Sequence, residues 1–194
     1  VNRLFAADLI REASDNGNDW CDLGTGTGLI PIEICRHRND VRILAVDAAI
    51  TMLELARYRI EAAGLIGRIQ LHHDDIKSNR LQSDYFDCVF SNSLVHHLPE
   101  PTHFFSQALR ILRPGGLLFV RDLFRPAQES ELEAIVSQIA HSESEAGQQL
   151  LRQSLRAALS IDELHMLLAS LGIPSHCAGQ TSDRHWTLIY RKAT

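Results

Sequence analysis

The sequence lacks a run of about 18 apolar residues, which a membrane-spanning helix needs, and it shows no signal peptide. It has only four cysteines, which are scattered and form no CxxC pair. A chain of this length does not need disulfides to fold, so these cysteines are expected to be buried free thiols in a reducing compartment. We therefore expect a cytoplasmic protein without a membrane span.

An excess of positive charge is also absent. The 19 lysines and arginines are outnumbered by 24 aspartates and glutamates, and the net charge is −5. Proteins that bind the phosphate backbone of nucleic acids need a dense basic face. We therefore expect neither a nucleic-acid partner nor a membrane surface as partner.

What is present is the composition of an ordinary globular protein, with 45% hydrophobic and 22% charged residues. The 194 residues suffice for one domain with a sizeable core. No linker separates a second domain, so we predict a single domain over residues 1–194. The sequence starts at Val1 rather than Met, already inside an amphipathic segment, so we expect further residues upstream of Val1.

Short apolar runs alternate with amphipathic segments through the first two thirds of the chain. Such alternation with short connections predicts right-handed crossovers and a parallel sheet with helices on both faces. The predicted strands are 19–24, 41–47, 68–75, 84–92 and 117–124, and the predicted helices are 28–38, 49–64 and 100–112. The fold class is therefore α/β.

The last third of the chain has a different pattern. Helices are predicted at 127–140, 145–159 and 160–172, and Ser160 and Glu163 predict a capping box at the start of the last of these. Two closing strands follow at 174–180 and 185–192. We predict that the helices from about 127 to 158 form an insertion over the active-site end of the sheet.

The segment "DLGTGTG" places Gly24, Gly26 and Gly28 at alternate positions after the first predicted strand. A dinucleotide-binding turn has its third glycine three positions after the second, where this chain has Leu29. The Gly-Lys-Ser/Thr ending of a phosphate-binding P-loop is also absent. The glycines allow close approach of the backbone to an anionic group at the helix N-terminus, either carboxylate or phosphate, or serve only a tight turn.

Two acidic positions follow on neighbouring strand ends. Asp47, roughly 20 residues past the glycines, suits the two hydroxyls of a ribose, and its alternative role is a helix N-cap. Asp74 and Asp75 end the third predicted strand. A carboxylate there can accept a hydrogen bond from an exocyclic amine such as that of adenine, and the alternative is a turn or cap residue.

Taken in order, five segments resemble the successive motifs of the class I S-adenosylmethionine-dependent methyltransferases. They are "DLGTGTG", "AVD", "DDI", "FDCVFSNSLVHHL" and "LRPGGLLFVRD", and they extend from Cys21 to Asp122. The resemblance implies a Rossmann-like, doubly wound, seven-stranded sheet whose last strand is antiparallel, and it implies S-adenosyl-L-methionine as the cofactor.

The resemblance also implies roles for single residues. The methionine part of the cofactor would lie against the glycine loop, the ribose against Asp47, adenine against the "DDI" segment, and the sulfonium near the end of the fourth strand. The cofactor-binding residues so implied are Asp22, Gly24, Thr25, Gly26, Asp47, Ala48, Met52, Asp75, Ile76, Ser91 and Asn92.

The sequence says less about the acceptor of the methyl group than about the cofactor. Nucleic-acid and protein amide N-methyltransferases of this class end the fourth strand in Asn/Asp-Pro-Pro-aromatic, whereas this chain has "SNSLVHHL", which favours a small-molecule acceptor. His96 is the candidate general base, with a hydrogen-bonded structural histidine as the alternative. Arg125 could hold an acidic substrate or belong to a salt bridge. Asp183 and His185 are only two possible metal ligands, which is too few to indicate a metal site, and we expect no metal.

The resulting hypothesis is an enzyme that transfers a methyl group from S-adenosylmethionine to an unidentified small molecule. One alternative is a module that binds S-adenosylmethionine without transferring the methyl group, since no catalytic base is certain from the sequence. A second alternative, an NAD-dependent oxidoreductase, is permitted by Asp47 but disfavoured by Leu29 and Asp22.

Overall fold

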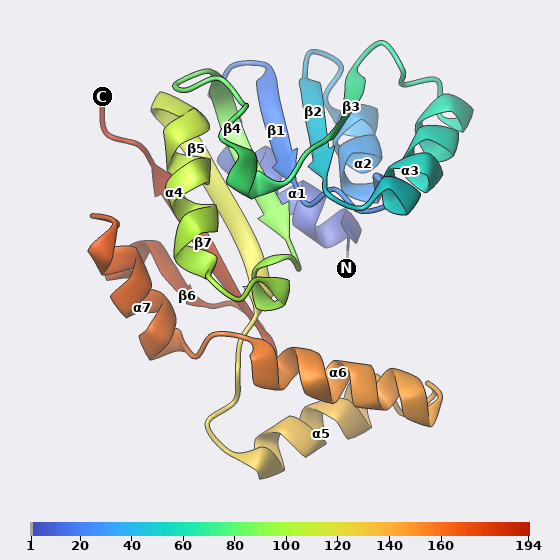
Figure 1. The fold of residues 1–194 in the computed structure, drawn as a ribbon, viewed down its shortest axis with the longest axis vertical. Coiled ribbons are helices and arrows are strands. Elements are labelled where there is room, and N and C mark those ends of the chain that lie inside the picture. The colour runs from blue at the N-terminus through green and yellow to red at the C-terminus, as the bar shows by residue number, and fades with distance from the viewer. Residues whose placement is uncertain (1) are drawn as a thin grey trace. The chain divides into compact units, whose positions relative to one another are not determined.

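The computed structural model describes residues 2–194, whose helices and strands are drawn in Figure 1. The internal contacts of the chain divide it into two compact units. Unit 1 comprises the chain up to Asn92 together with His103–Val120 and Ile189–Thr194. Unit 2 comprises Ser93–Thr102 and Arg121–Leu188. Among the described residues, no helix is both long and apolar enough to cross a membrane.

Four parallel strands form most of the sheet in unit 1: β1 (Asp19–Leu23), β2 (Arg42–Asp47), β3 (Ile69–His73) and β4 (Phe86–Asn92). β1 lies between β2 and β4, and Cys21 is opposite both Leu44 and Val89. Since all four strands are parallel, their carboxyl ends lie at one edge of the sheet, where ligands bind in folds of this type.

The helices of unit 1 are α1 (Asn2–Glu12), α2 (Leu29–His37), α3 (Ile50–Ala62) and α4 (Pro101–Ile111). The first two residues of α4 belong to unit 2. Apolar side chains of α1, α2 and α3 form one core with those of the strands. Phe5 of α1 packs edge-on against Phe119, with ring centroids 5.2 Å apart. This core fixes the strand ends that carry the candidate site.

Within the described residues, the sheet has seven strands in the order β3-β2-β1-β4-β5-β7-β6, which confirms the predicted fold class. The last three strands are β5 (Leu112–Leu123), β6 (Ala178–Gln180) and β7 (His185–Arg191), and β6 and β7 are antiparallel.

The fifth and sixth strands differ from their predicted bounds. β5 already begins at Leu112 rather than after the "RPGG" segment, because Gly115 and Gly116 pair with Lys192 near the chain end. Gly115 nevertheless has the left-handed φ of 75° that favours glycine. The predicted strand at 174–180 is shorter than expected, because η3 (Ser175–Cys177) is a 3-10 turn.

Unit 2 contains α5 (Glu129–Ile139), α6 (Glu145–Ala157), α7 (Ile161–Ser170) and the 3-10 turn η2 (Val95–His97). The three helices predicted for this region are therefore present, and the predicted capping box at the start of α7 is formed by Ser160 and Glu163. α5 packs on α6 through a small apolar cluster, and α6 also packs against η2.

A testable consequence concerns Gly28, which precedes α2 with φ 74° and whose added Cβ would lie 3.1 Å from the Cβ of Ala56. We expect Gly28→Ala to lower the free energy of unfolding by about 2 kcal/mol or more, because it combines left-handed strain with a contact against α3. Gly64→Ala is the matched control, since Gly64 has φ 70° but nothing within 4 Å of an added Cβ. Equal losses in urea denaturation would contradict the role of the α2–α3 contact.

Candidate functional site

The glycine loop after β1 is held against the end of β2 by main-chain hydrogen bonds. Gly24 and Thr25 both donate to the carbonyl of Val46 at 2.9 Å, and Gly26 donates to Oδ2 of Asp47 at 2.7 Å. Gly24 and Gly26 have φ of 79° and 55°, which a residue with a Cβ rarely adopts. A Cβ added to Gly26 would meet nothing within 4 Å, so the loop has open space beside it for a ligand.

Asp47 connects this loop to the start of α3. Its second oxygen, Oδ1, accepts the N–H of Ala49 at 2.8 Å, so the residue caps the helix entrance as well as the loop. A carboxylate oxygen has two acceptor sites, and one on each oxygen remains for a further donor. The cap and the ribose contact that the sequence left open are therefore compatible with each other.

Asp22 is the buried carboxyl group of the site. Its side chain is 2% exposed, and Oδ2 has no hydrogen-bond partner among the described residues. Burial raises the pKa of Asp22 to about 7, the nearby Thr25 hydroxyl offsets part of the rise, and the carboxylate of Asp47 adds to it. A buried carboxyl group without a partner favours a cationic ligand group beside it.

The segment after β3 forms a 3-10 turn, η1 (Ile76–Ser78), that Asp75 caps by accepting the N–H of Lys77 at 2.9 Å. Asp74 is buried and accepts a hydrogen bond from the Ser78 hydroxyl at 2.6 Å. Burial acts to raise the pKa of Asp74, but Ser78 and the positive charge of Arg80 together lower it below its usual value. Asp74 is thus engaged within the protein, whereas Asp75 and Ile76 are at least partly accessible.

The remaining cofactor candidates of unit 1 differ in accessibility. The Ser91 hydroxyl is fully buried and donates to the carbonyl of Leu23 at 2.7 Å, which joins β4 to β1. Asn92 is half-buried at the carboxyl end of β4. Ala48 and Met52 are exposed at the start of α3. Their contacts with a ligand stay predictions, as do those of the other residues.

Unit 2 contains a histidine–carboxylate pair that the sequence analysis did not recognise. Nδ1 of His96 lies 2.6 Å from Oδ1 of Asp122, and the two side chains are only 6% and 1% exposed. Asp122 also accepts the main-chain N–H groups of Val95 and Leu123. The positions of the two residues were a signal for this pair. His96 follows β4, Asp122 lies near the end of β5, and β4 and β5 are neighbours in the sheet.

The rings of His96 and His97 are also in contact, with centroids 3.9 Å apart. Burial lowers the pKa of His97, with a further contribution from His96. Asp122 makes its short hydrogen bond to His96, so His96 is the better placed of the two histidines for proton transfer.

The other polar residues singled out in the sequence have partners within unit 2. Arg125 donates to Glu163 and to the carbonyl of Ala158. Of the two roles considered for Arg125, this is the salt bridge and not the binding of an acidic substrate. Asp183 pairs with Arg184, and His185 bonds with the Ser182 hydroxyl at 2.8 Å. Burial first, then Arg184 and Arg121, lower the pKa of His185 to about 4. Within residues 2–194, no cluster of three or more His, Cys, Asp or Glu could hold a metal.

Comparison with known proteins agrees with this geometry. A family model described as a methyltransferase domain matches residues 21–116, which include the glycine loop, Asp47 and the end of β4. An S-adenosyl-L-methionine-dependent methyltransferase structure from Methanococcus maripaludis superposes with a TM-score of 0.78 at 21% identity, covering 100% of this chain and 85% of that chain.

Two curated relatives are similar over part of their length. The chain is 27% identical to a 27-O-demethylrifamycin SV methyltransferase of Amycolatopsis mediterranei, over 86% of this chain and 58% of the relative. It is 24% identical to a ubiquinone/menaquinone biosynthesis C-methyltransferase of a Marinomonas species, over 68% of this chain and 53% of the relative. The chain therefore spans little more than half the length of these relatives.

The buried carboxyl group of Asp22 generates a prediction for the ligand-free protein. Its pKa is raised in the folded state, so folded Asp22 keeps its proton at pH values where unfolded Asp22 has lost it, and folding stability falls as the pH rises from about 4 to 7. Asp22→Asn removes this dependence.

Urea denaturation of both proteins at several pH values measures this effect. The advantage of Asp22→Asn over the original protein is expected to grow by up to about 1.4 kcal/mol per pH unit and to level off above pH 7. A difference that does not change with pH would show that Asp22 ionises normally.

Proposed function

This chain belongs to the class I S-adenosylmethionine-dependent methyltransferase family, and we propose that it methylates a hydroxyl group of a small-molecule acceptor. The observation that carries the choice of a hydroxyl group is the buried pair of His96 and Asp122. An acceptor that keeps a proton at the moment of attack needs a base, and a hydroxyl is such an acceptor.

Unit 1 offers the groups that would hold the cofactor. The unpartnered Oδ2 of Asp22 suits the cofactor's ammonium group, and the open side of Gly26 leaves room for its methionine part. The remaining acceptor sites of Asp47 suit the ribose hydroxyls. Asp75 and the main chain of Ile76 suit adenine, at the carboxyl end of the neighbouring strand.

S-adenosylmethionine supplies a methyl group that is already activated on a sulfonium. The protein then has to align the acceptor with it, exclude water and remove the acceptor's proton. His96 is four residues beyond Asn92, so its Cα lies within about 14 Å of the Cα of Asn92, whatever path the chain takes.

Asp122 determines which ring nitrogen of His96 can act as the base. Because Asp122 accepts from Nδ1–H, the neutral imidazole has its lone pair on Nε2. In this proposal Nε2 takes the proton from the acceptor hydroxyl as oxygen attacks the methyl carbon, and Asp122 stabilises the imidazolium that forms. His96 is the catalytic residue and Asp122 is a positioning residue.

Three observations support a small molecule as the acceptor. The fourth strand ends in "SNSLVHHL" without the Asn/Asp-Pro-Pro-aromatic motif, and the net charge is −5. One relative is named for 27-O-demethylrifamycin SV, which is a small molecule.

We place the reaction in the cytoplasm, in line with four cysteines that form no disulfide.

The acceptor pocket is proposed to be bordered by α5 and α6, within a single catalytic domain over residues 1–194. Support comes from the packing of α6 against η2, the turn that carries His96. The apolar residues Leu132, Val136 and Leu155 hold α5 on α6, so the two helices form one body.

Cofactor binding is tested by calorimetric titration of S-adenosylhomocysteine. Asp22→Asn and Asp47→Asn are each expected to weaken binding about tenfold or more, because each removes a charged hydrogen-bond acceptor. Asp19→Asn is the matched control, since Asp19 is at the other end of β1 and pairs with Arg42. Failure of the unaltered, folded protein to bind would contradict the proposed cofactor site.

Catalysis is tested by following S-adenosylhomocysteine release with a panel of phenolic and alcoholic small molecules. His96→Gln is expected to lower kcat by about 10²–10⁴-fold, as for loss of a general base, while binding of S-adenosylhomocysteine is unchanged. Asp122→Asn is expected to lower kcat and alter its pH profile, because the His96 tautomer is no longer fixed.

His97→Gln is the matched control for the catalytic variants, since His97 adjoins His96 but lacks its short bond to Asp122. Full turnover by His96→Gln would exclude the proposed base. Binding of S-adenosylhomocysteine without turnover of any acceptor by the unaltered protein would favour the alternative, a module that binds the cofactor without transferring the methyl group.

A further inference from the structure

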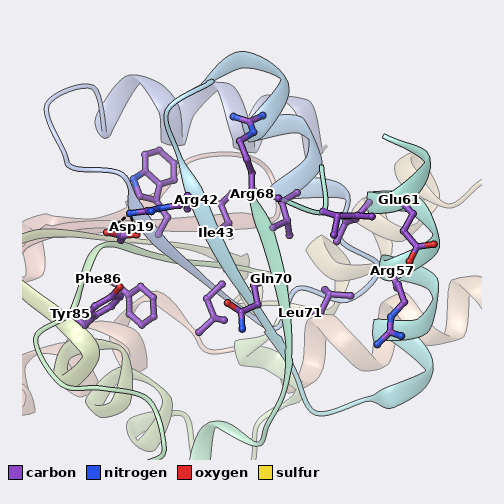
Figure 2. Close-up of a pocket in the computed structure, with 16 residues that line it drawn as sticks. Asp19, Arg42, Ile43, Arg57, Glu61, Arg68, Gln70, Leu71, Tyr85 and Phe86 are labelled. Atoms are coloured by element: carbon purple, nitrogen blue, oxygen red, sulfur yellow. Dashed lines mark hydrogen bonds and ion pairs between the residues drawn. The ribbon is translucent and has the colours of Figure 1, made fainter. Parts of the chain in front are cut away.

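Unit 1 has a concave surface at the opposite ends of its strands from the glycine loop. A groove of about 800 Å³ lies at the amino-terminal ends of β1, β2 and β4 and along β3 and the end of α3 (Figure 2). The candidate cofactor site is at the opposite, carboxyl ends of the same strands. The groove therefore belongs to neither the cofactor nor the proposed chemistry.

The rim of the groove is partly apolar. Apolar side chains at its rim remain exposed, with Ile66 at 66% and Tyr85 at 46% of their surface. Such a surface is a candidate contact with another molecule.

The groove also includes the edge of the sheet. β3 is the first strand in the sheet order and has a neighbour on only one side, β2. Its outer main-chain groups are therefore open to pairing with a further strand, and Gln70 is exposed along it.

Two opposite charges on α3 indicate what the partner is. Arg57 and Glu61 are exposed, one turn apart, and neither makes an ion pair or hydrogen bond within the described residues (Figure 2). An arginine four residues before a glutamate is the less favourable order for pairing within one helix. The two charges are thus available for a partner that presents the opposite charges at the same spacing.

A second copy of the same chain presents such charges. In a two-fold dimer the same surface patch is used by both copies, so residue i of one meets residue j of the other and the reverse. When two α3 helices lie antiparallel about an axis near Arg59, Arg57 of each copy is opposite Glu61 of the other. The two positions are about 6 Å apart along each helix, so both pairs form together.

We propose that this protein forms a two-fold dimer through the β3–α3 edge, with reciprocal pairs between Arg57 of one copy and Glu61 of the other. In this dimer the exposed edge of β3 is covered by its symmetry mate. The dimer is independent of the proposed methyl transfer, because neither Arg57 nor Glu61 belongs to the cofactor site or to the pair of His96 and Asp122.

Sedimentation equilibrium of the purified chain tests the proposal. The unaltered protein is expected to sediment with twice the 21.8 kDa mass of one chain. Arg57→Glu and Glu61→Arg, taken singly, are each expected to sediment as monomers, because they place like charges opposite each other. Glu143→Arg is the matched control, an exposed charge reversal in the turn between α5 and α6, and it is expected to remain dimeric.

The decisive measurement is an equimolar mixture of the two single variants. One variant carries two acidic and the other two basic side chains at these positions, so the mixture is expected to recover the dimer mass, as is the double variant with both charges exchanged. A monomeric unaltered protein at concentrations up to about 100 μM, single variants that stay dimeric, or a mixture that stays monomeric would each overturn the proposal.

Discussion

The candidate site depends on the carboxylate of Asp47, which accepts main-chain hydrogens from Gly26 at 2.7 Å and from Ala49 at 2.8 Å. These two bonds connect the loop after β1 to the entrance of α3. Together with the carbonyl of Val46, which accepts from Gly24 and Thr25, they satisfy the main-chain donors of three successive loop residues. A donor left unsatisfied in such a place costs about 1–3 kcal/mol, so the left-handed glycines and Asp47 stabilise one another.

Asp22 lies in the strand that precedes this loop. Within β1, Asp22 is buried and near Asp47, and burial together with the neighbouring carboxylate disfavours its charged form. Asp47 has two main-chain donors in the same region, whereas Oδ2 of Asp22 has none. An ammonium group beside Asp22 would reverse that balance, and this gives the site a physical preference for an amino-acid-like ligand end.

In unit 2 a single carboxylate has a comparable organising role. Asp122 accepts from the main chain of Val95 as well as from His96, so the turn η2 and the orientation of the imidazole are determined together. The pair is buried, which strengthens the electrostatic interaction between its members. The same acidic side chain therefore supports both the local backbone and the proposed proton transfer.

Much of the fold could be predicted from the sequence because the relevant signals are local. The alternation of apolar runs and amphipathic segments predicted the parallel strands and helices, and Ser160 and Glu163 predicted the start of α7. Local signals failed where pairing with a residue far away in the sequence sets the bounds of an element. β5 starts early because Gly115 and Gly116 pair with Lys192, which is far along the chain.

The sequence by itself determined the fold class and the residue types at the strand ends, because side-chain periodicity and glycine spacing act over a few residues. Only the tertiary structure decided which of these residues meet. It joined His96 to Asp122, let Asp47 serve as a cap while retaining acceptor sites, and left Arg57 and Glu61 without partners. Such pairings depend on the order of the strands and on burial, and neither is encoded in the spacing of residues along the chain.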